Sequence, residues 1–487
     1  MASTVSSVST NYTVADTLQL SLLDWAAAIR EGKISSTACL ELHLAAVAEF
    51  NPRFNAIVTL NPEAREQAAE ADRLAQQGQW AGPLHGVPFT AKDTLAAAGM
   101  TATAGSPLLK DYVPDEDSTS VARLKSAGAI LVGKTNCSEF AVATHSSNPV
   151  FGDTWNPWNM SVTSGGSSGG DSAAVASGMA SFGVGTDFGG SIRWPAHCAG
   201  LTSMRPTVGL IPQTGMLPFV PGDTFPAPSS LSVLHRLGTI GWIARSTGDH
   251  QTLLELLKGP DHVDPNTVPA QLYAPAPVES LNCAWFSGEG NFPIRHDVES
   301  VLEAAASALA DRGLSVVERR PPAIERAAEA FIGLRTTAGM PEVQALAAGR
   351  EELVSEHLRE SLLNPVQATV SDYRQAGSVR DEILREVLNF MEEHQILLLP
   401  VACVPAVDPR QDRVDVDGTP VAWSDLGSSC RAISILGFPV VVVPCGMSKE
   451  GLPVGVQVIG RPYDDLTVIE VAKALENSLG RFPLPRQ

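Results

Sequence analysis

Two serines lie in glycine-rich segments that are 24 residues apart in the sequence. Ser167 is part of GGSSGG at residues 165–170, and Ser191 directly follows Gly189 and Gly190. Glycine is favoured where the backbone needs a positive φ or must come close to a ligand. Two such turns, each with a hydroxyl group, indicate a site that uses bare backbone N–H groups together with serine oxygens.

Lys92 ends a short apolar segment, GVPFTAKD at residues 86–93, that predicts a strand. Acyl transfer requires an activated hydroxyl, a base that is free near neutral pH and hydrogen-bond donors for the oxyanion. Burial lowers the pKa of a lysine from about 10.4, so a neutral Lys92 would take a proton from one serine through the other. The alternatives are a salt bridge between Lys92 and Asp93 or Asp187, and a purely structural hydroxyl at Ser167.

The first glycine-rich segment also fits a second hydrolase motif. Residues 165–169 match GxSxG, the nucleophile elbow of α/β-hydrolases, which would make Ser167 the nucleophile of an esterase with a later Asp and His as partners. Such an elbow directly follows a strongly apolar strand, and residues 159–164 form a poor one. This pattern is therefore the weaker interpretation of Ser167.

Two further motif matches predict other chemistry. Residues 128–135, GAILVGKT, match the P-loop pattern of nucleotide-binding proteins, but the four aliphatic residues predict a strand where a phosphate needs a flexible loop. A cysteine nucleophile would use Cys137 with His145, or His197 with Cys198. Isolated cysteines are more often buried apolar groups, so both matches are disfavoured.

Composition narrows the class of protein. The chain has 487 residues and a net charge of −19 without a basic block, which disfavours nucleic acid and anionic membranes as partners. Its seven cysteines are scattered without a CxxC pair, which indicates a reducing compartment and neither a zinc site nor a disulfide framework. The first residues lack a signal-peptide pattern, and no apolar run reaches the length of a membrane span. We therefore expect a cytoplasmic protein.

Helix and strand patterns alternate along most of the chain. Near-continuous apolar segments such as residues 396–399 and 440–443 predict strands that are buried on both faces. With the helices between them they predict an α/β protein, a three-layer α/β/α sandwich. We expect a flexible segment 1–15 and one domain over 16–483. The expected parts of this domain are N-terminal helices over 18–78, of which one closes before Asn51-Pro52, a catalytic core over about 80–260, and long helices over 322–360 and 368–394.

Taken together, these segments resemble the amidase signature family of serine hydrolases. The resemblance covers nearly the whole chain and rests on GPLHGVPFTAKDT around Lys92, GAILVGKTNCSEFA, WNPWN, GGSSGG, GVGTDFGGSIRWPAHCAGLTSMRPTVG, FPVVVVPCG and GLPVGVQVIG. The separation of 24 residues between Ser167 and Ser191 is the one that the family keeps. The resemblance implies a single mixed sheet of about ten strands between layers of helices.

The resemblance also implies a role for each residue of the site. Ser191 is expected to be the acylated nucleophile, Ser167 the bridging serine after a non-proline cis peptide bond, and Lys92 the base. Backbone N–H groups of the second turn are expected to form the oxyanion hole, namely those of Phe188, Gly189, Gly190 and Ser191. Supporting roles, which hold the loop and the serines by hydrogen bonds, are expected for Ser168, Asp187 and Arg193.

Two residues depart from the family pattern. Asp171 stands where many members have serine or alanine, and Phe188 replaces a smaller residue beside the oxyanion hole. We expect neither to touch the set formed by the lysine and the two serines. Phe188 together with Trp194 predicts an entrance that is lined by aromatic rings.

The substrate pocket is expected in the variable parts of the chain. These are the surroundings of residues 143–145, the irregular segment 211–238 and the helices of about 320–395. The candidate pocket residues are Thr144, His145, Trp194, Met216 and Phe219. The apolar side chains of 211–238 favour an aromatic or otherwise hydrophobic group on the substrate.

The expected function is that of an amidase that needs no cofactor and no metal. The resemblance leaves the substrate open among small aliphatic amides, aryl amides, carbamates and ureido compounds. It also leaves one alternative, the A-type glutaminase subunit of a tRNA-dependent amidotransferase, which needs partner proteins. That class is expected to have a tyrosine-rich segment at the position of residues 366–395. In this chain the segment contains a single tyrosine, Tyr373. A homodimer is a further implication of the resemblance.

Overall fold

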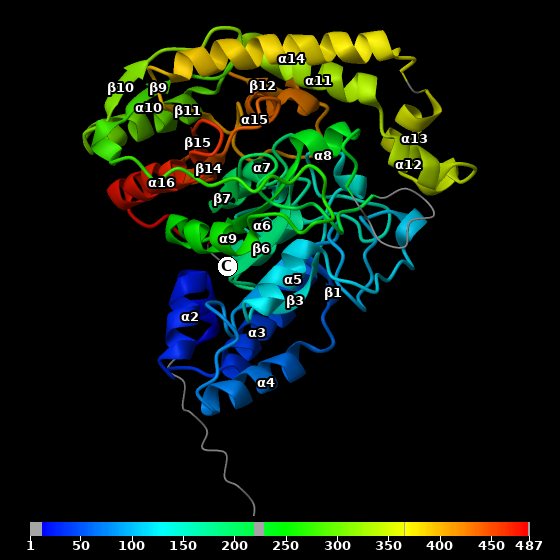
Figure 1. Ribbon diagram of the computed structural model, residues 1–487, viewed down its shortest axis with the longest axis vertical. Helices are drawn as coiled ribbons and strands as arrows, with labels where there is room; N and C mark the ends of the chain where they lie inside the picture. Colours follow the sequence, from blue (N-terminus) through cyan, green and yellow to red (C-terminus); the bar gives the residue numbers. More distant parts are fainter. Residues whose placement is uncertain (1–11, 219–227, 365, 486–487) are drawn as a thin grey trace, which may run out of the picture.

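A computed structural model describes residues 12–218, 228–364 and 366–485 of the chain. Eleven strands in this part form one mixed sheet, in the order β1-β3-β2-β6-β8-β7-β14-β15-β11-β9-β10 (Figure 1). The strands are β1 (Ile57–Leu60), β2 (Pro88–Lys92), β3 (Ile130–Thr135), β6 (Phe182–Asp187), β7 (Thr202–Arg205), β8 (Thr239–Ala244), β9 (Asn282–Trp285), β10 (Ser315–Glu318), β11 (Ile396–Pro400), β14 (Val440–Met447) and β15 (Pro453–Ile459). The predicted mixed sheet is confirmed, with one strand more than expected.

Helices cover both faces of the sheet. In the described residues they are α1 (Val14–Gln19), α2 (Leu22–Arg30), α3 (Ser36–Phe54), α4 (Ala64–Gln76), α5 (Thr119–Ser126), α6 (Gly169–Ala176), α7 (Arg193–Ala199), α8 (Val233–Leu237), α9 (His250–Leu257), α10 (His296–Ala310), α11 (Ala327–Ala338), α12 (Pro341–Ala347), α13 (Glu356–Leu363), α14 (Val370–Met391), α15 (Ser428–Ser434) and α16 (Asp465–Leu479).

The two faces of the sheet can be followed along β14. Val441 and Val443 belong to the core cluster that contains residues of α10 and α16. Val440 belongs to the cluster that contains residues of α11, α14 and α15, and Val442 to the cluster that contains residues of α6 and α7. This alternation arises because successive side chains of a strand point to opposite faces. The predicted three-layer α/β/α arrangement is therefore confirmed, and central strands such as β11 and the first part of β14 are continuously apolar because both of their faces are buried.

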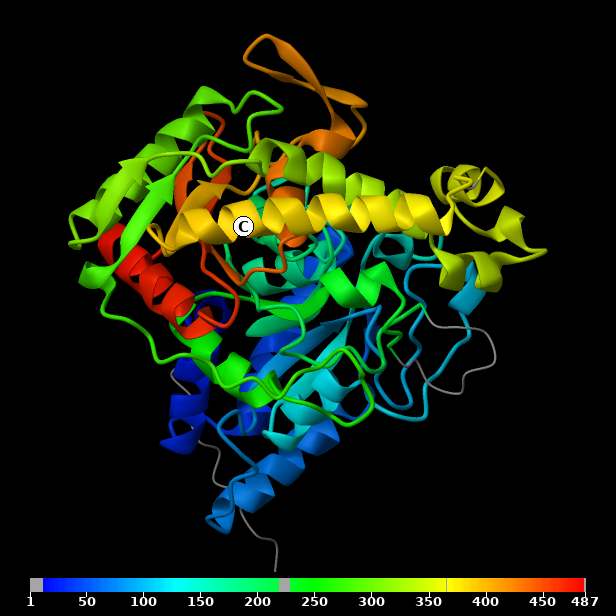
Figure 2. The same cartoon turned by 45° about the horizontal axis from the view of Figure 1, so that its top comes forward.

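Two hairpins lie outside the main sheet. β4 (Trp155–Asn156) pairs with β5 (Asn159–Thr163), and β12 (Arg413–Val416) pairs with β13 (Thr419–Ala422). β5 is thus a strand, but it is not part of the central sheet. The two views show α14 running along one side of the molecule, with α12 and α13 beyond its N-terminal end (Figures 1 and 2).

The helical region before α14 differs from the expectation. The prediction of long helices over 322–360 is wrong, because three short helices, α11, α12 and α13, occupy this region. Gly339 ends α11 with a φ of +67°, and Pro341 begins α12. Glycine at a helix end and proline in the first turn are typical stop and start signals, so the chain turns where one long helix was expected.

Three smaller expectations are corrected near loops and ends. α3 does not close before Asn51-Pro52 but continues to Phe54, because the Asn51 side chain accepts the N–H groups of Ala56 and Ile57 just beyond it. The irregular segment 211–238 contains the short helix α8, and its residues 219–227 lie outside the described part. The proposed flexible segment 1–15 also falls largely outside it, and α1 begins at Val14. Among the described residues, no helix has the length and the apolar character needed to cross a lipid bilayer.

Candidate active site

The ends of two neighbouring strands bring Lys92 to Ser167. β2 and β6 are parallel, so their C-terminal ends meet at the same edge of the sheet. Lys92 is the last residue of β2, and its Nζ lies 2.6 Å from Ser167 Oγ and 2.9 Å from Thr186 Oγ1 on β6. Lys92 and Ser167 are fully buried. The amine is therefore held by hydroxyl groups and is removed from water.

Burial lowers the pKa of Lys92 to about 8, against the opposing effect of nearby negative charges that include Asp171. Burial also raises the pKa of Asp171 to about 7, while contacts with the hydroxyls of Thr135 and Thr90 lower it. Thr90 Oγ1 lies 3.2 Å from Asp171 Oδ1. As expected, no hydrogen bond or ion pair joins Asp171 to Lys92, Ser167 or Ser191 among the described residues, but its negative charge opposes the lowering of the pKa of Lys92.

The expected alternatives for Lys92 do not occur. Among the ion pairs of the described residues, Asp93 pairs with Lys134 at 3.3 Å and Asp187 pairs with Arg193 and Arg205. Lys92 is in none of them. Its hydrogen-bond partners are hydroxyl groups, which leave the neutral amine accessible to a proton from Ser167.

The second turn is organised by Asp187, the last residue of β6. Its carboxylate accepts the N–H groups of Gly190 at 2.9 Å and Ile192 at 3.2 Å, and it pairs with the buried guanidinium of Arg193 at 2.9 Å. Burial alone would raise the pKa of Asp187, but the charge and hydrogen bonds of Arg193, with Arg205, hold it well below its usual range. A permanently charged carboxylate thus fixes the shape of the turn.

The two serine turns are joined by backbone contacts. The peptide bond between Gly166 and Ser167 is cis, as the resemblance implied. The N–H group of Ser168 donates to the carbonyl oxygen of Ser191 at 3.1 Å. The Ser168 hydroxyl has no hydrogen-bond partner among the described residues, so Ser168 acts here through its backbone.

One of the four expected oxyanion donors is already engaged. The N–H group of Gly190 donates to Asp187, so it is not available to a substrate oxygen in this arrangement. The N–H groups of Phe188, Gly189 and Ser191 donate to no other described residue. The expected oxyanion hole therefore reduces to three donors, because the carboxylate that shapes the turn uses the fourth.

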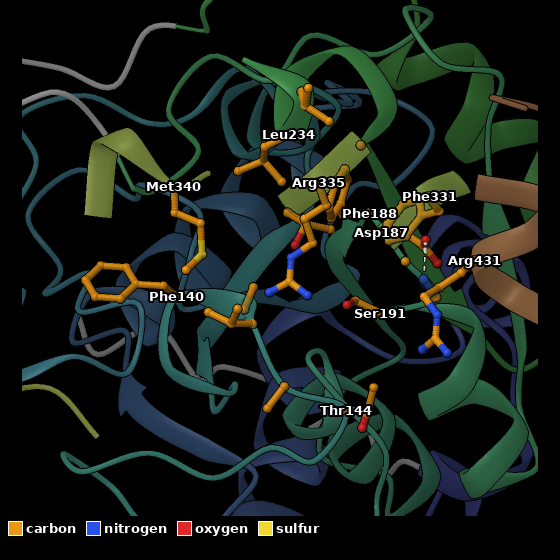
Figure 3. A pocket seen from close by; sticks show the side chains of 18 of the residues that line it. Phe140, Thr144, Asp187, Phe188, Ser191, Leu234, Phe331, Arg335, Met340 and Arg431 are labelled. Carbon is orange, nitrogen blue, oxygen red and sulfur yellow. Dashed lines mark hydrogen bonds between the residues drawn. The ribbon is translucent and has the colours of Figure 1, made fainter. Parts of the chain in front are cut away.

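Ser191 opens into a cavity of about 510 Å³ (Figure 3). Of the expected pocket residues, Thr144, Trp194 and Met216 line it. His145 does not: its Nδ1 lies 2.9 Å from Thr163 Oγ1, and its Nε2 lies 3.7 Å from Asp153. Phe219 lies outside the described residues.

Sequence reasoning missed several residues of this cavity. The missed lining residues include Phe140, Phe331, Arg335, Trp423 and Arg431. The ring of Phe331 lies 4.8 Å from that of Phe188. Phe331 therefore adds a third aromatic ring to Phe188 and Trp194, which were expected to line the entrance. The helices of 320–395 were expected near the pocket, but no local pattern singled out the faces of α11 that line it.

The other motif matches do not form sites. Lys134 of the P-loop match is buried within β3 and pairs with Asp93, so no phosphate cradle exists there. β5, which precedes Ser167, lies outside the central sheet, so GxSxG is not an α/β-hydrolase elbow. Burial raises the pKa of the Cys137 thiol to about 12, and burial also holds the pKa of the Cys198 thiol well above its usual value. Among the described residues, no three His, Cys, Asp or Glu side chains gather as metal ligands would.

Comparisons with known proteins agree with this architecture. A family model described as amidase matches residues 38–469. The indoleacetamide hydrolase of Bradyrhizobium diazoefficiens is 35% identical over 468 residues, which cover 95% of this chain and 87% of that protein. The A-type subunit of the glutamyl-tRNA(Gln) amidotransferase of a Roseiflexus species is 32% identical, with 94% of this chain and 96% of that protein covered. The native peptide amidase from Stenotrophomonas maltophilia has a similar structure, with a TM-score of 0.81 at 27% identity over 96% of this chain and 98% of that one.

Proposed function

The chain belongs to the amidase family, and from this premise we propose that it hydrolyses the amide bond of a small compound through an ester on Ser191. The observation that carries the proposal is the hydrogen bond of 2.6 Å between Lys92 Nζ and Ser167 Oγ, at a lysine whose pKa burial lowers to about 8. Burial makes the neutral form of this amine more accessible near physiological pH than it is in a solvated lysine. It is therefore able to accept a proton from a serine.

In the first half of the reaction, Ser191 Oγ attacks the amide carbon. Its proton passes to Ser167 Oγ, whose own proton moves to Lys92 Nζ. The N–H groups of Phe188, Gly189 and Ser191 stabilise the negative charge that develops on the former carbonyl oxygen. The C–N bond then breaks, the leaving nitrogen takes a proton from Ser167, and Ser167 recovers one from the lysine. An amine or ammonia leaves, and the acyl group remains on Ser191.

In the second half, water attacks the ester carbon. Its proton follows the same route through Ser167 to Lys92. The ester bond breaks, Ser191 Oγ recovers a proton from Ser167, and Ser167 recovers one from Lys92, so Lys92 is neutral again. Overall, one water molecule is consumed and one carboxylic acid and one amine or ammonia are formed. The balance requires no oxidant and no further reactant.

The lining of the cavity supports an aromatic group on the substrate. Rings of Phe140, Phe188, Phe331, Trp194 and Trp423 surround it, and aromatic side chains bind apolar rings through offset or edge contacts. A relative with 35% identity is named indoleacetamide hydrolase. We therefore place aryl acetamides first among the substrates, before aliphatic amides and aryl carbamates.

The test is a panel of indole-3-acetamide, phenylacetamide, hexanamide and an aryl carbamate, combined with labelling by a serine-directed phosphonate. The wild-type protein is expected to hydrolyse the aryl acetamides and to be labelled at Ser191. Ser191→Ala is expected to lose both properties, and Ser161→Ala, which changes an exposed serine, is expected to keep both. Hydrolysis by Ser191→Ala at the wild-type rate would refute the mechanism.

A second candidate is the glutaminase component of an amidotransferase. The 32% identity to such a protein over 94% of this chain favours it, whereas the lack of a tyrosine-rich segment near Tyr373 argues against it. Glutamine hydrolysis that requires co-purifying partner proteins would support this candidate. Hydrolysis of aryl acetamides by the isolated chain, with none of glutamine, would exclude it.

A further inference from the structure

Arg335 on α11 brings an unpaired positive charge into the cavity of Ser191. Its guanidinium points into the space that Ser191 and Thr144 also face (Figure 3). Among the described residues it has no hydrogen-bond or ion-pair partner. The second arginine of the cavity differs, because Arg431 donates to the carbonyl oxygen of Ser424 and lies 3.3 Å from Asp425.

The surroundings of Arg335 make this charge costly. Apolar side chains such as Leu234 and Met340 line the same part of the cavity, and a charge that is partly removed from water is unfavourable unless it is paired. Burial lowers the pKa of Arg335, and the charge of Arg431 lowers it further. The guanidinium nevertheless stays protonated in proteins. An anion placed beside it would remove this cost.

No carboxylate of the described protein fills this role. Glu342 also lines the cavity, but it forms no ion pair with Arg335. Asp425 is held by Arg431. The pairing partner of Arg335 is therefore missing from the described part of the chain, which is the condition expected of a residue that binds a substrate group.

The helix that carries Arg335 has a defined position relative to the nucleophile. Arg335 lies one helical turn after Phe331, so both side chains are on the same face of α11. The ring of Phe331 contacts that of Phe188 at 4.8 Å, and Phe188 begins the turn that leads to Ser191. Phe331 and Leu334 anchor α11 in the core against α14 and α15. The guanidinium of Arg335 on α11 and the hydroxyl of Ser191 are thus carried by two segments that contact each other through Phe331 and Phe188.

We propose that this cavity takes amides whose non-reacting end carries a carboxylate or a similar anion, and that Arg335 binds this group while the amide carbon meets Ser191. The guanidinium suits this role because it donates two parallel N–H groups to a carboxylate. The inference rests on the proposed amidase function and specifies its substrate class. Arg335 thereby becomes a specificity residue for the reaction.

The experiment compares matched substrates that differ only in charge. Phenylacetamide, 4-carboxyphenylacetamide and 4-(aminomethyl)phenylacetamide provide a neutral, an anionic and a cationic aryl amide. Hexanamide, adipic acid monoamide and 6-aminohexanamide provide the same series on a flexible chain. The readout is the ratio of kcat/KM between the anionic and the neutral member, because a ratio within one variant is insensitive to losses of folded enzyme. Protection of Ser191 from phosphonate labelling gives the same comparison where turnover is slow.

The wild type is expected to prefer the anionic member of at least one series. Arg335→Gln is expected to reduce the preference by about 10- to 100-fold, since hydrogen bonds to charged groups are of that strength, and mainly through KM. Arg335→Glu is expected to favour the cationic member. Arg326→Gln is the matched control. Arg326 is an exposed arginine that directly precedes α11 and pairs with Glu382 of α14, so its loss is expected to keep the wild-type ratio.

Two outcomes overturn the inference and one separates it from the proposed function. The inference fails if kcat/KM of the wild type is the same for the neutral and the anionic member of both series. It also fails if Arg335→Gln keeps the wild-type ratio of kcat/KM between these members. In either case the amidase function stands. Absence of hydrolysis across the panel together with no labelling of Ser191 overturns the proposed function itself, and the substrate class falls with it.

Discussion

Asp93 pairs with Lys134 at 3.3 Å and leaves its sequence neighbour Lys92 without a carboxylate partner. Asp93 directly follows the last residue of β2, and its carboxylate pairs with the amine of Lys134 on the neighbouring strand β3 and not with that of Lys92. Asp93 is further held by the N–H group and the hydroxyl of Thr103. The adjacent charge is thus sequestered, and the hydrogen bonds of Lys92 go to hydroxyl groups.

The first prediction concerns the pH dependence of activity. Because the proposed base Lys92 can accept a proton only when it is neutral, kcat/KM for indole-3-acetamide should rise with pH and level off above about pH 8, since burial lowers the pKa of Lys92 to about that value. The substrate does not titrate in this range, so the rise reports on the enzyme. The measurement is kcat/KM from about pH 6 to 10, a range centred on that pKa. A profile that is flat across the lower half of this range would contradict a lysine base.

The second prediction concerns Asp171. Its negative charge favours the protonated form of Lys92, so Asp171→Asn should lower the pKa of the lysine. The rising limb of the pH profile should then move to lower pH. Asp153→Asn, which removes a carboxylate paired with His145 outside the cavity, is the matched control and should leave the limb in place. An unchanged limb in Asp171→Asn would limit Asp171 to a structural role.

The residues at the centre of the candidate site could be proposed from the sequence, and the structure brings Lys92 and Ser167 together and places Ser191 at a cavity. Lys92, Ser167 and Ser191 each lie in a short segment with a recognisable pattern, and the separation of the two serines is specific. The buried strands could be predicted because a sheet covered on both faces needs continuous apolar runs, as in β11 and β14.

The influence of Asp171 on Lys92 could not be predicted in this way. α6 packs against β6 where Gly183 and Gly185 have no side chains, and a Cβ at Gly183 would lie 2.7 Å from Asp171 Oδ1. The carboxylate therefore occupies space that depends on two glycines of another element. Arg335 is similar, since it reaches the cavity only through the packing of α11. Contacts between distant segments of this kind leave no local pattern in the sequence.

The third prediction concerns stability. Asp187→Asn leaves Arg193 and Arg205 buried without their counter-ion. Removing one partner of a buried ion pair costs about 3–5 kcal/mol. The free energy of unfolding of Asp187→Asn, measured by urea titration, should therefore be lower than that of the wild type by about that amount. Asp381→Asn, which removes an exposed partner of Arg380, should cost at most about 1 kcal/mol. Equal losses in the two variants would contradict the prediction.

The same pair has a pH signature. Because the pKa of Asp187 in the folded protein lies below its usual range, its stabilisation is fully present above the unfolded value of about 3.9 and is lost as the pH falls towards the folded value. The difference in the free energy of unfolding between the wild type and Asp187→Asn should therefore be constant near neutral pH and become smaller below about pH 4. Measurement of both proteins from about pH 3 to neutral pH checks the direction.

The fourth prediction concerns the turn before Ser191, the proposed nucleophile. Gly190 has a φ of +117°, and a Cβ there would lie 2.6 Å from the Cβ of Cys430. Gly190→Ala must therefore adopt an unfavourable backbone conformation and displace a packed side chain, which costs about 2–4 kcal/mol. The displacement moves Ser191, the next residue, so kcat/KM should fall by about 100-fold even in the folded fraction. Gly333→Ala is the control, because its Cβ meets nothing within 4 Å in the middle of α11, and it should gain up to about 1 kcal/mol of stability. The prediction would be contradicted if Gly190→Ala retained both the unfolding midpoint and the activity of the wild type, because the turn would then not be needed to position Ser191.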